Sequence, residues 1–197
     1  AAAEATPGTA AIVAAEVGFP VAVKSLKRSA GRSARAGVAL DLGSTADVIE
    51  AVDTMVDGLG NDAGTLVVQE MVPPGVDARI HCQHDDRLGV IVTVGYGGAD
   101  ANLIDDRASR LAPLSHASAS AMLTETKVGA ALESSALDPS PLVDAIVLAA
   151  QLCADQGDVD ELDLNPVIVS DAGAIVTDAT VRLLDRPDGE AALRRLD

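Results

Sequence analysis

A short stretch that follows the first predicted strand concentrates positive charge in an otherwise acidic chain. Glycines and serines separate its two lysines and three arginines: Lys24, Lys27, Arg28, Arg32 and Arg35. Cations on a loop whose glycines expose backbone N–H groups suit a polyphosphate, so Lys24, Arg28 and Arg32 are candidate phosphate contacts. The alternative is a solvated basic loop that balances nearby carboxylates, and the charge pattern favours neither interpretation. The chain has no Walker A sequence, which excludes a P-loop.

A second group of candidate residues lies on the last predicted element, a β-hairpin of strands 161–169 and 174–183 closed by a turn at 170–173. If the turn is centred on that segment, Asn165 lies directly opposite Asp178 on one face of the hairpin. Opposed residues have Cβ atoms about 5 Å apart. One amide and one carboxylate at that distance could share a Mg²⁺ ion, which prefers hard oxygen ligands.

The same face of the hairpin carries more carboxylates. Glu161 and Asp163 precede Asn165 by four and two residues, so their side chains lie on its side of the strand. A row of carboxylates repels itself unless a cation or solvent intervenes. The alternative is an ordinary exposed strand face. A register shift of one residue would remove the pairing of Asn165 with Asp178.

The thiols and histidines form no comparable pattern. Cys82 and Cys153 are too few for a disulfide framework, and we expect reduced thiols in an intracellular protein. Cys82 and His84 share a strand face, but no second pair has zinc-ligand spacing. His116 lies near a predicted helix start and is expected at the surface. No nucleophile–base motif or dinucleotide fingerprint is present.

The elements that must position these groups follow from hydrophobic periodicity and capping signals. We expect helices at 6–17, 44–55, 116–132 and 141–155, and strands at 19–24, 37–42, 65–72, 77–84 and 88–95 before the hairpin. Strands and helices interleave without a strict βαβ repeat, which predicts α+β layers. The sequence Pro73-Pro74-Gly75 is the expected boundary between lobes 1–72 and 73–197.

Composition narrows the possible partners. The chain has 197 residues, 48% of them apolar, with a formal net charge of -16, one Tyr, one Phe and no Trp. Phosphate-backbone readers need positive charge and single-strand readers need aromatic rings, so nucleic acid and an anionic membrane surface are both improbable partners. No run of eighteen apolar residues and no signal peptide is present, so we expect a cytoplasmic location. The abrupt start suggests a segment of a longer chain.

Seven segments carry a family resemblance in order along nearly the whole chain. They are Gly18–Lys24, Val68–Val72, Gly75–Asp77, Gly95–Gly98, Arg110–Leu114, Glu161–Pro166 and Thr177–Ala179. Together they resemble the ATP-grasp domain of ADP-forming acyl-CoA synthetases, related to the β subunit of succinyl-CoA synthetase. The resemblance implies an ATP-grasp fold of class α+β, in which two α/β lobes grip ATP or ADP in a cleft.

The resemblance also implies roles for individual residues. Lys24 matches a lysine that contacts nucleotide phosphates. Glu70 and Val72 match an interlobe hinge whose backbone groups read the adenine edge. Asp77 stands where the family usually has Glu facing the ribose hydroxyls.

The metal ligands follow from the same resemblance. Asn165 and Asp178 match Mg²⁺ ligands of the family, and we expect them to converge with the cationic loop on one cleft.

Departures from the family are equally informative. The family loop after the lysine holds a histidine linked to phosphoryl relay, whereas no histidine lies between Lys24 and Val38 here. Asn102 stands where the family tends to have Glu. The beginning of the usual domain and the CoA-binding and ligase domains are absent from this sequence. These departures favour a degenerate, regulatory module of a larger protein such as a GNAT lysine acetyltransferase. The alternatives are a working ADP-forming acyl-CoA ligase domain and a purely structural lobe.

Overall fold

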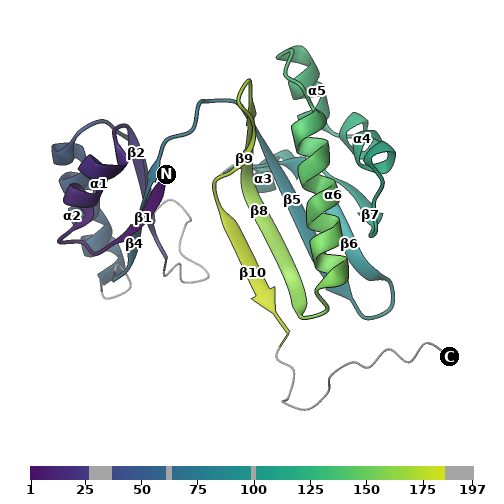
Figure 1. Cartoon of the computed structure of the whole chain (residues 1–197), viewed down its shortest axis with the longest axis horizontal. Helices are drawn as coiled ribbons and strands as arrows, with labels where there is room; N and C mark the ends of the chain where they lie inside the picture. The colour runs from purple at the N-terminus through teal and green to yellow at the C-terminus, as the bar shows by residue number, and fades with distance from the viewer. Residues whose placement is uncertain (27–36, 61–63, 99–100, 185–197) are drawn as a thin grey trace. The chain divides into compact units, whose positions relative to one another are not determined.

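The computed structural model describes residues 1–26, 37–60, 64–98 and 101–184, without the side chains of 102 and 103. The chain divides into two compact units, Ala1–Val72 and Pro73–Asp197. Each unit has its own sheet and its own hydrophobic cluster. Figure 1 labels the elements of both.

In its described residues, the first unit contains a four-stranded antiparallel sheet in the order β1-β4-β2-β3. Its elements are β1 (Ala2–Ala5), α1 (Ala10–Val17), β2 (Val21–Ser25), β3 (Val38–Leu42), α2 (Thr45–Leu59) and β4 (Leu66–Glu70). Both helices pack on this sheet and share one core with it. In the central strand β2 almost every residue is buried, which agrees with its prediction as a buried strand.

Capping fixes the start of α2, and amphipathicity carries the helix further than predicted. The Ser44 hydroxyl accepts the Asp47 N–H at 3.2 Å, as expected of an N-cap. The Asp47 carboxylate in turn accepts the Gly43 N–H at 3.0 Å, one residue before the N-cap. The helix runs to Leu59 rather than to about residue 55 because Leu59 continues the buried stripe of the helix.

The second unit contains an antiparallel sheet that, within the described residues, has six strands. Five follow the order β10-β8-β5-β6-β7, and β9 also pairs with β8. Its elements are β5 (Val76–Asp85), β6 (Gly89–Tyr96), α3 (Ala101–Ile104), β7 (Ala108–Leu111), α4 (His116–Thr124), α5 (Lys127–Ser134), α6 (Ser140–Asp155), β8 (Val159–Ser170), β9 (Gly173–Val176) and β10 (Ala179–Leu183). Helix α6 lies across one face of the sheet (Figure 1) and packs on β5, β6 and β8.

One predicted helix is two helices. The segment 116–132 was expected to be continuous, but α4 ends at Thr124 and α5 begins at Lys127. Thr126 starts the second helix, because its hydroxyl accepts the Gly129 N–H at 3.2 Å. The Asp106 carboxylate accepts the N–H groups of Lys127 and Val128 at 2.8 and 3.0 Å, so the new helix start has a second cap from a distant segment.

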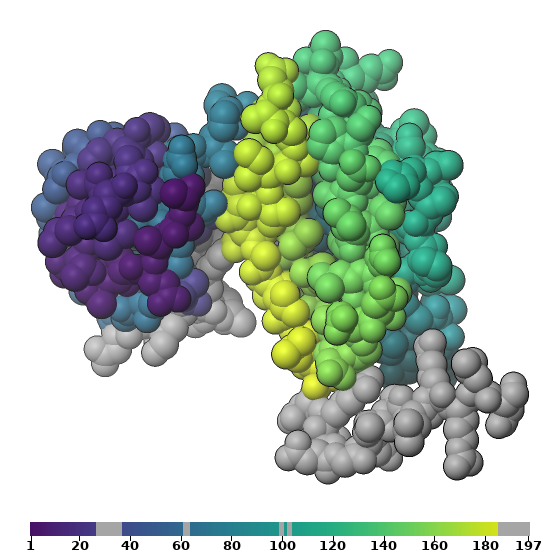
Figure 2. All heavy atoms as spheres, viewed as in Figure 1, coloured from purple at the N-terminus to yellow at the C-terminus, as the bar shows by residue number. Residues whose placement is uncertain are grey.

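The two faces of the second sheet differ in character. Along β5, the buried residues Ala78, Ile80 and Cys82 face the helices, and the alternate residues Arg79 and His81 lie on the opposite face. We call that opposite face, formed by β5, β8 and β10, the open face. Figure 2 shows β9 and β10 in yellow at the edge of the unit, beside α6 in green. Within the ranges described above, every helix is too short or too polar to span a lipid bilayer.

Candidate functional site

The hairpin has the register that its turn predicts. Strands β8 and β9 pair from Ser170↔Gly173 to Val167↔Val176, and the pairing resumes at Leu164↔Ala179. Between these stretches the Asn165 N–H donates to the backbone oxygen of Asp178 at 3.1 Å. The predicted position of Asn165 opposite Asp178 is therefore confirmed at the backbone. The returning arm is two strands rather than one, because residues 177–178 interrupt it.

Gly98 joins Asn165 to Asp77. The Gly98 N–H donates to Asn165 Oδ1 at 2.7 Å. Gly98 has φ +75°, and a Cβ added to it would lie 2.6 Å from Asp77 Oδ2. The neighbouring Gly97 N–H donates to the Asp77 backbone oxygen at 2.9 Å. The glycine turn thus brings two predicted site residues from β5 and β8 together, a role that sequence reasoning did not give it.

The chemistry of this group suits a hard cation. Burial raises the pKa of the Asp77 carboxyl, because leaving water disfavours the charged form, and a nearby cation would oppose that effect. Asn165 Oδ1 has a second lone pair beyond the one that Gly98 occupies. Among the described residues, no three His, Cys, Asp or Glu side chains cluster to hold a metal unaided. An ion here would need water and substrate oxygens as further ligands, which is how Mg²⁺ is usually bound.

Lys24 lies on β2 in the first unit. It is partly buried, and its Nζ donates to Gln69 Oε1 on β4 at 3.0 Å. This contact fixes the lysine head group at the end of a strand, where the sequence predicted it. Arg28 and Arg32, the other candidate phosphate contacts, lie outside the described residues.

The predicted hinge residues Glu70 and Val72 lie at and just after the end of β4. The Glu70 carboxylate is exposed and accepts from the Ala1 amino group at 2.8 Å, which lowers the pKa of Glu70. Val72 is partly buried in the segment that follows. These residues and Lys24 belong to the first unit, whereas Asp77, Asn165 and Asp178 belong to the second. Their convergence on one cleft stays a prediction.

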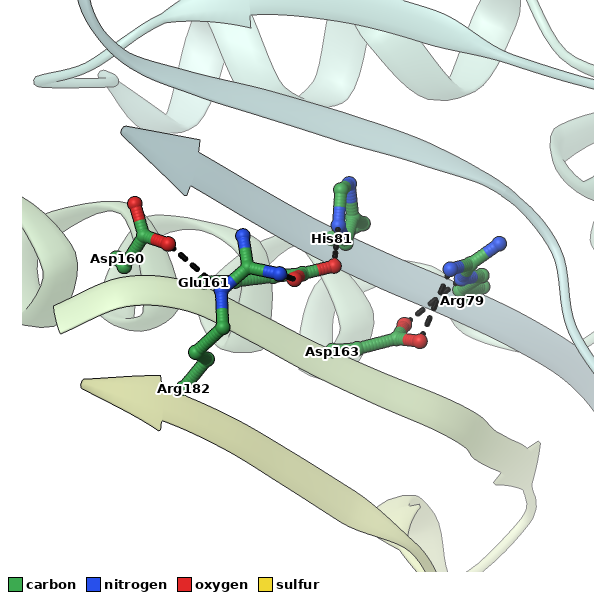
Figure 3. A network of polar contacts seen from close by, with 6 residues as sticks. All are labelled: Arg79, His81, Asp160, Glu161, Asp163 and Arg182. Atoms are coloured by element: carbon green, nitrogen blue, oxygen red, sulfur yellow. Dashed lines mark hydrogen bonds and ion pairs between the residues drawn. The ribbon is translucent and has the colours of Figure 1, made fainter. Parts of the chain in front are cut away.

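The row of carboxylates on β8 is bound by two arginines and a histidine that sequence reasoning missed (Figure 3). Arg79 binds Asp163 through two hydrogen bonds, Nε–Oδ1 at 2.7 Å and Nη2–Oδ2 at 2.9 Å. His81 Nε2 lies 2.8 Å from Glu161 Oε1. From the edge strand, Arg182 contacts Asp160 and Glu161 at 2.6 and 2.9 Å. The intervening cation anticipated for this face is therefore supplied by the protein.

A signal for this network was present in the sequence. Residues 77–83 alternate between polar and small or apolar side chains with a period of two, which assigns Arg79 and His81 to one face of the strand. The strand order that places β5 beside β8 was not predictable from that alternation, because it depends on long-range pairing.

The thiols and His116 behave as expected. Cys82 and Cys153 are free and buried in the core between the sheet and α6. His116 is the first residue of α4 and is exposed, with Nε2 3.1 Å from Asp144 Oδ1.

Comparison with known proteins identifies the family. A model described as an ATP-grasp domain matches residues 2–183, so the chain belongs to the ATP-grasp family. The β subunit of acetate–CoA ligase [ADP-forming] I from Pyrococcus furiosus is 25% identical over 178 residues, covering 85% of this chain and 77% of that subunit. Acetate–CoA ligase [ADP-forming] II from Archaeoglobus fulgidus is 28% identical over 177 residues. The chain spans only 26% of that longer ligase.

Solved structures agree with this assignment. A dinucleotide-forming acetyl-coenzyme A synthetase 1 from Ca. Korarchaeum cryptofilum, solved with coenzyme A and Ca-AMPCP, has a TM-score of 0.80 and 29% identity. The match covers 93% of this chain and 86% of that one. The predicted α+β ATP-grasp fold is confirmed, and the chain is an ATP-grasp module related to ADP-forming acyl-CoA synthetases.

Proposed function

We propose that this chain binds MgATP or MgADP as one module of a larger acyl-CoA synthetase-like protein. The observation that carries the proposal is the group around Gly98: Asn165 accepts its N–H, the Asp77 carboxylate lies where a Cβ at Gly98 would point, and Asp178 lies opposite Asn165. The similarity to a synthetase solved with a nucleotide analogue supports the same function.

Each predicted residue has a role in this proposal. Asn165 and Asp178 hold Mg²⁺, whose chemistry is to bridge phosphate oxygens and offset their charge. Lys24, with Arg28 and Arg32, contacts the phosphates. The hinge backbone at Glu70 and Val72 reads the adenine edge, and Asp77 faces the ribose hydroxyls.

The module is, in this proposal, degenerate and regulatory, within a cytoplasmic parent protein such as a GNAT lysine acetyltransferase. What supports degeneracy is the lack of histidine between Lys24 and Val38. The synthetase of Ca. Korarchaeum cryptofilum, by contrast, has been solved with a phosphorylated phosphohistidine segment. Nucleotide occupancy would then report the energy state to a catalytic domain elsewhere in the parent.

A working ligase domain is the second candidate function. Its support is that several relatives are named as ADP-forming ligases of different acids, including a 4-hydroxybutyrate–CoA ligase from Nitrosopumilus maritimus that is 29% identical. In this case the CoA-binding and ligase domains of the parent, or a partner subunit, would supply the phosphoryl acceptor.

Nucleotide binding is tested by thermal unfolding with Mg²⁺. At a ligand concentration of 100 Kd, binding to the folded state contributes about 2.7 kcal/mol. That corresponds to a rise of about 5–10 °C in Tm for a chain of this size. No shift with millimolar MgATP or MgADP would favour a structural lobe instead.

The metal assignment is tested by Asp178→Ala. This variant should weaken ATP binding strongly with Mg²⁺ and little without it, as measured by calorimetry. Asp171→Ala is the matched control, because it removes the same charge from an exposed position in the turn of the same hairpin. Equal losses with and without Mg²⁺ would remove Asp178 from the metal site.

Degeneracy is tested by incubating the protein with γ-³²P-labelled ATP. We expect no acid-labile, base-stable label, because the basic loop offers no imidazole to accept the phosphoryl group. A label with the stability of phosphohistidine would favour the working ligase.

A further inference from the structure

Arg79 lies across from the candidate metal ligand Asn165 on the neighbouring strand. Strand β5 pairs with β8 at Ala78↔Val167 and again at Ile80↔Leu164, with a register shift between the two pairs. Arg79 alone therefore faces two residues of β8, Asn165 and Pro166. Such bulges re-aim side chains and recur beside active sites. Neighbouring strands are about 4.8 Å apart, so Arg79 reaches the surroundings of Asn165 without crossing another strand.

Asp163 holds this guanidinium in one orientation. The pair is bidentate and only partly exposed, at 32% for the Arg79 side chain and 24% for that of Asp163. Two-point contacts fix the plane of the guanidinium, which a single contact does not. Nε and Nη2 face the carboxylate, and Nη1 has no hydrogen-bond partner among the described residues. Arg79 therefore keeps donors available in a fixed direction.

The strand on the other side of Arg79 presents backbone rather than a side chain beside it. Arg79 pairs with Gly95 on β6, so no side chain flanks it from that strand. A Cβ at Gly95 would lie 1.8 Å from the Asp106 backbone oxygen, so this position excludes every other residue. Arg79 therefore lies between the Gly95 backbone of β6 and the bulged residues Asn165 and Pro166 of β8.

Arg182 shows what an ordinary ion pair looks like on the same face. It contacts Asp160 and Glu161 from the edge strand, its side chain is 56% exposed, and it lies opposite Glu161, four residues from Asn165. Both arginines border a register shift, but Arg79 differs from Arg182 in lying on a central strand and in being less exposed. Neutralisation of the β8 carboxylates explains both arginines equally well, but it does not explain why Arg79 lies on a central strand opposite Asn165.

We propose that Arg79 binds the terminal phosphate of the nucleotide beside the metal ion, with Asp163 as its positioning residue. The inference rests on the proposed function and adds an anion subsite to it. The ligand chemistry is a phosphate oxyanion, which the γ-phosphate of ATP or a free phosphate ion could supply.

The test compares affinities for AMP, ADP and ATP in Mg²⁺, measured by calorimetry on the full chain. Arg79→Gln should lower ATP affinity about 10- to 100-fold, the range for a hydrogen bond to a charged group, and leave AMP affinity within about twofold. Arg182→Gln is the matched control, since it removes the same charge from the same network and should change none of the three.

Two further variants separate positioning from charge. Asp163→Asn removes a negative charge, which by charge alone would raise ATP affinity, whereas loss of the fixed orientation lowers it. We expect lower affinity, with partial recovery in Asp163→Glu. If Arg79→Gln fails to fold, Arg79→Lys takes its place in the test. This variant keeps the charge but not the planar donors, and it should lose most of the preference for ATP over AMP.

The possible outcomes are distinct. Equal losses for AMP, ADP and ATP, or an unchanged ATP-to-AMP ratio, would overturn the inference while nucleotide binding stands. A wild-type protein that binds none of the three removes the proposed function and the inference with it. Inorganic phosphate that binds the MgADP complex in wild type but not in Arg79→Gln would support the same subsite and identify the free ion as a second occupant.

Discussion

At the scale of single residues, Gly98 has two functions that no other residue could combine. Its N–H positions the Asn165 amide, and its missing side chain leaves space for the Asp77 carboxylate. It also has φ +75°, a conformation that costs other residues free energy. The candidate site of the second unit therefore depends on a residue that contributes no side chain.

Gly98→Ala and Gly89→Ala should separate backbone strain from damage to the site. Both glycines have positive φ, and the Cβ added at Gly89 meets nothing within 4 Å. Each variant should lose about 1–2 kcal/mol of unfolding free energy, the usual cost of the left-handed region. The new Cβ at Gly98 meets the mobile end of Asp77, which can rotate away, so that variant should also lose nucleotide affinity.

Urea unfolding measures the loss of stability, and calorimetry measures the loss of nucleotide affinity. Nucleotide affinity that falls equally in both variants, or in neither, would mean that the Asp77 carboxylate has no part in binding.

At the scale of elements, local signals explain the strands and the caps but not the helix break. Alternation placed β5 and β6, and the turn at 170–173 gave the hairpin register, because both depend on neighbours in sequence. The start of α5 has a local cap in Thr126, but its second cap, Asp106, approaches Lys127 only in the folded chain. The diagonal pairing of Arg79 with Asp163 likewise requires β5 and β8 to be adjacent.

The break between α4 and α5 reverses the usual effect of alanine in a helix. Alanine in place of a helical glycine ordinarily stabilises by about 1 kcal/mol. At Gly129 the added Cβ would lie 1.9 Å from the Leu123 backbone oxygen, because α4 ends against the start of α5. Gly129→Ala should therefore destabilise the protein.

Gly58→Ala in α2 is the control, since its Cβ would meet nothing within 4 Å, and it should show the ordinary gain. Chemical denaturation of both variants shows directly whether the free energy of unfolding rises or falls. A stabilised Gly129→Ala would show that the two helices do not meet as described.

At the scale of the whole molecule, the chain carries two separate hydrophobic clusters. One is formed by the first unit and the other by the second, and the two share no residue among those described. Both cysteines belong to the second cluster, where burial raises the pKa of the Cys82 and Cys153 thiols. Because the thiolate is the reactive form, the folded protein should resist alkylation at pH 8, where unfolded thiols of pKa about 8.5 react readily.

This protection makes the thiols a probe for the opening of the second unit. Val128→Ala on α5 removes two buried carbons from the cluster that contains both cysteines, at a cost of about 1–3 kcal/mol. When opening is fast relative to labelling, iodoacetamide labelling should accelerate about 5- to 140-fold, because each 1.4 kcal/mol raises the open population tenfold. Val48→Ala on α2 removes the same carbons from the cluster of the first unit and should leave the labelling rate unchanged. Mass spectrometry follows the labelling. If both variants accelerated it equally, the two units would unfold as one cooperative body despite their separate cores.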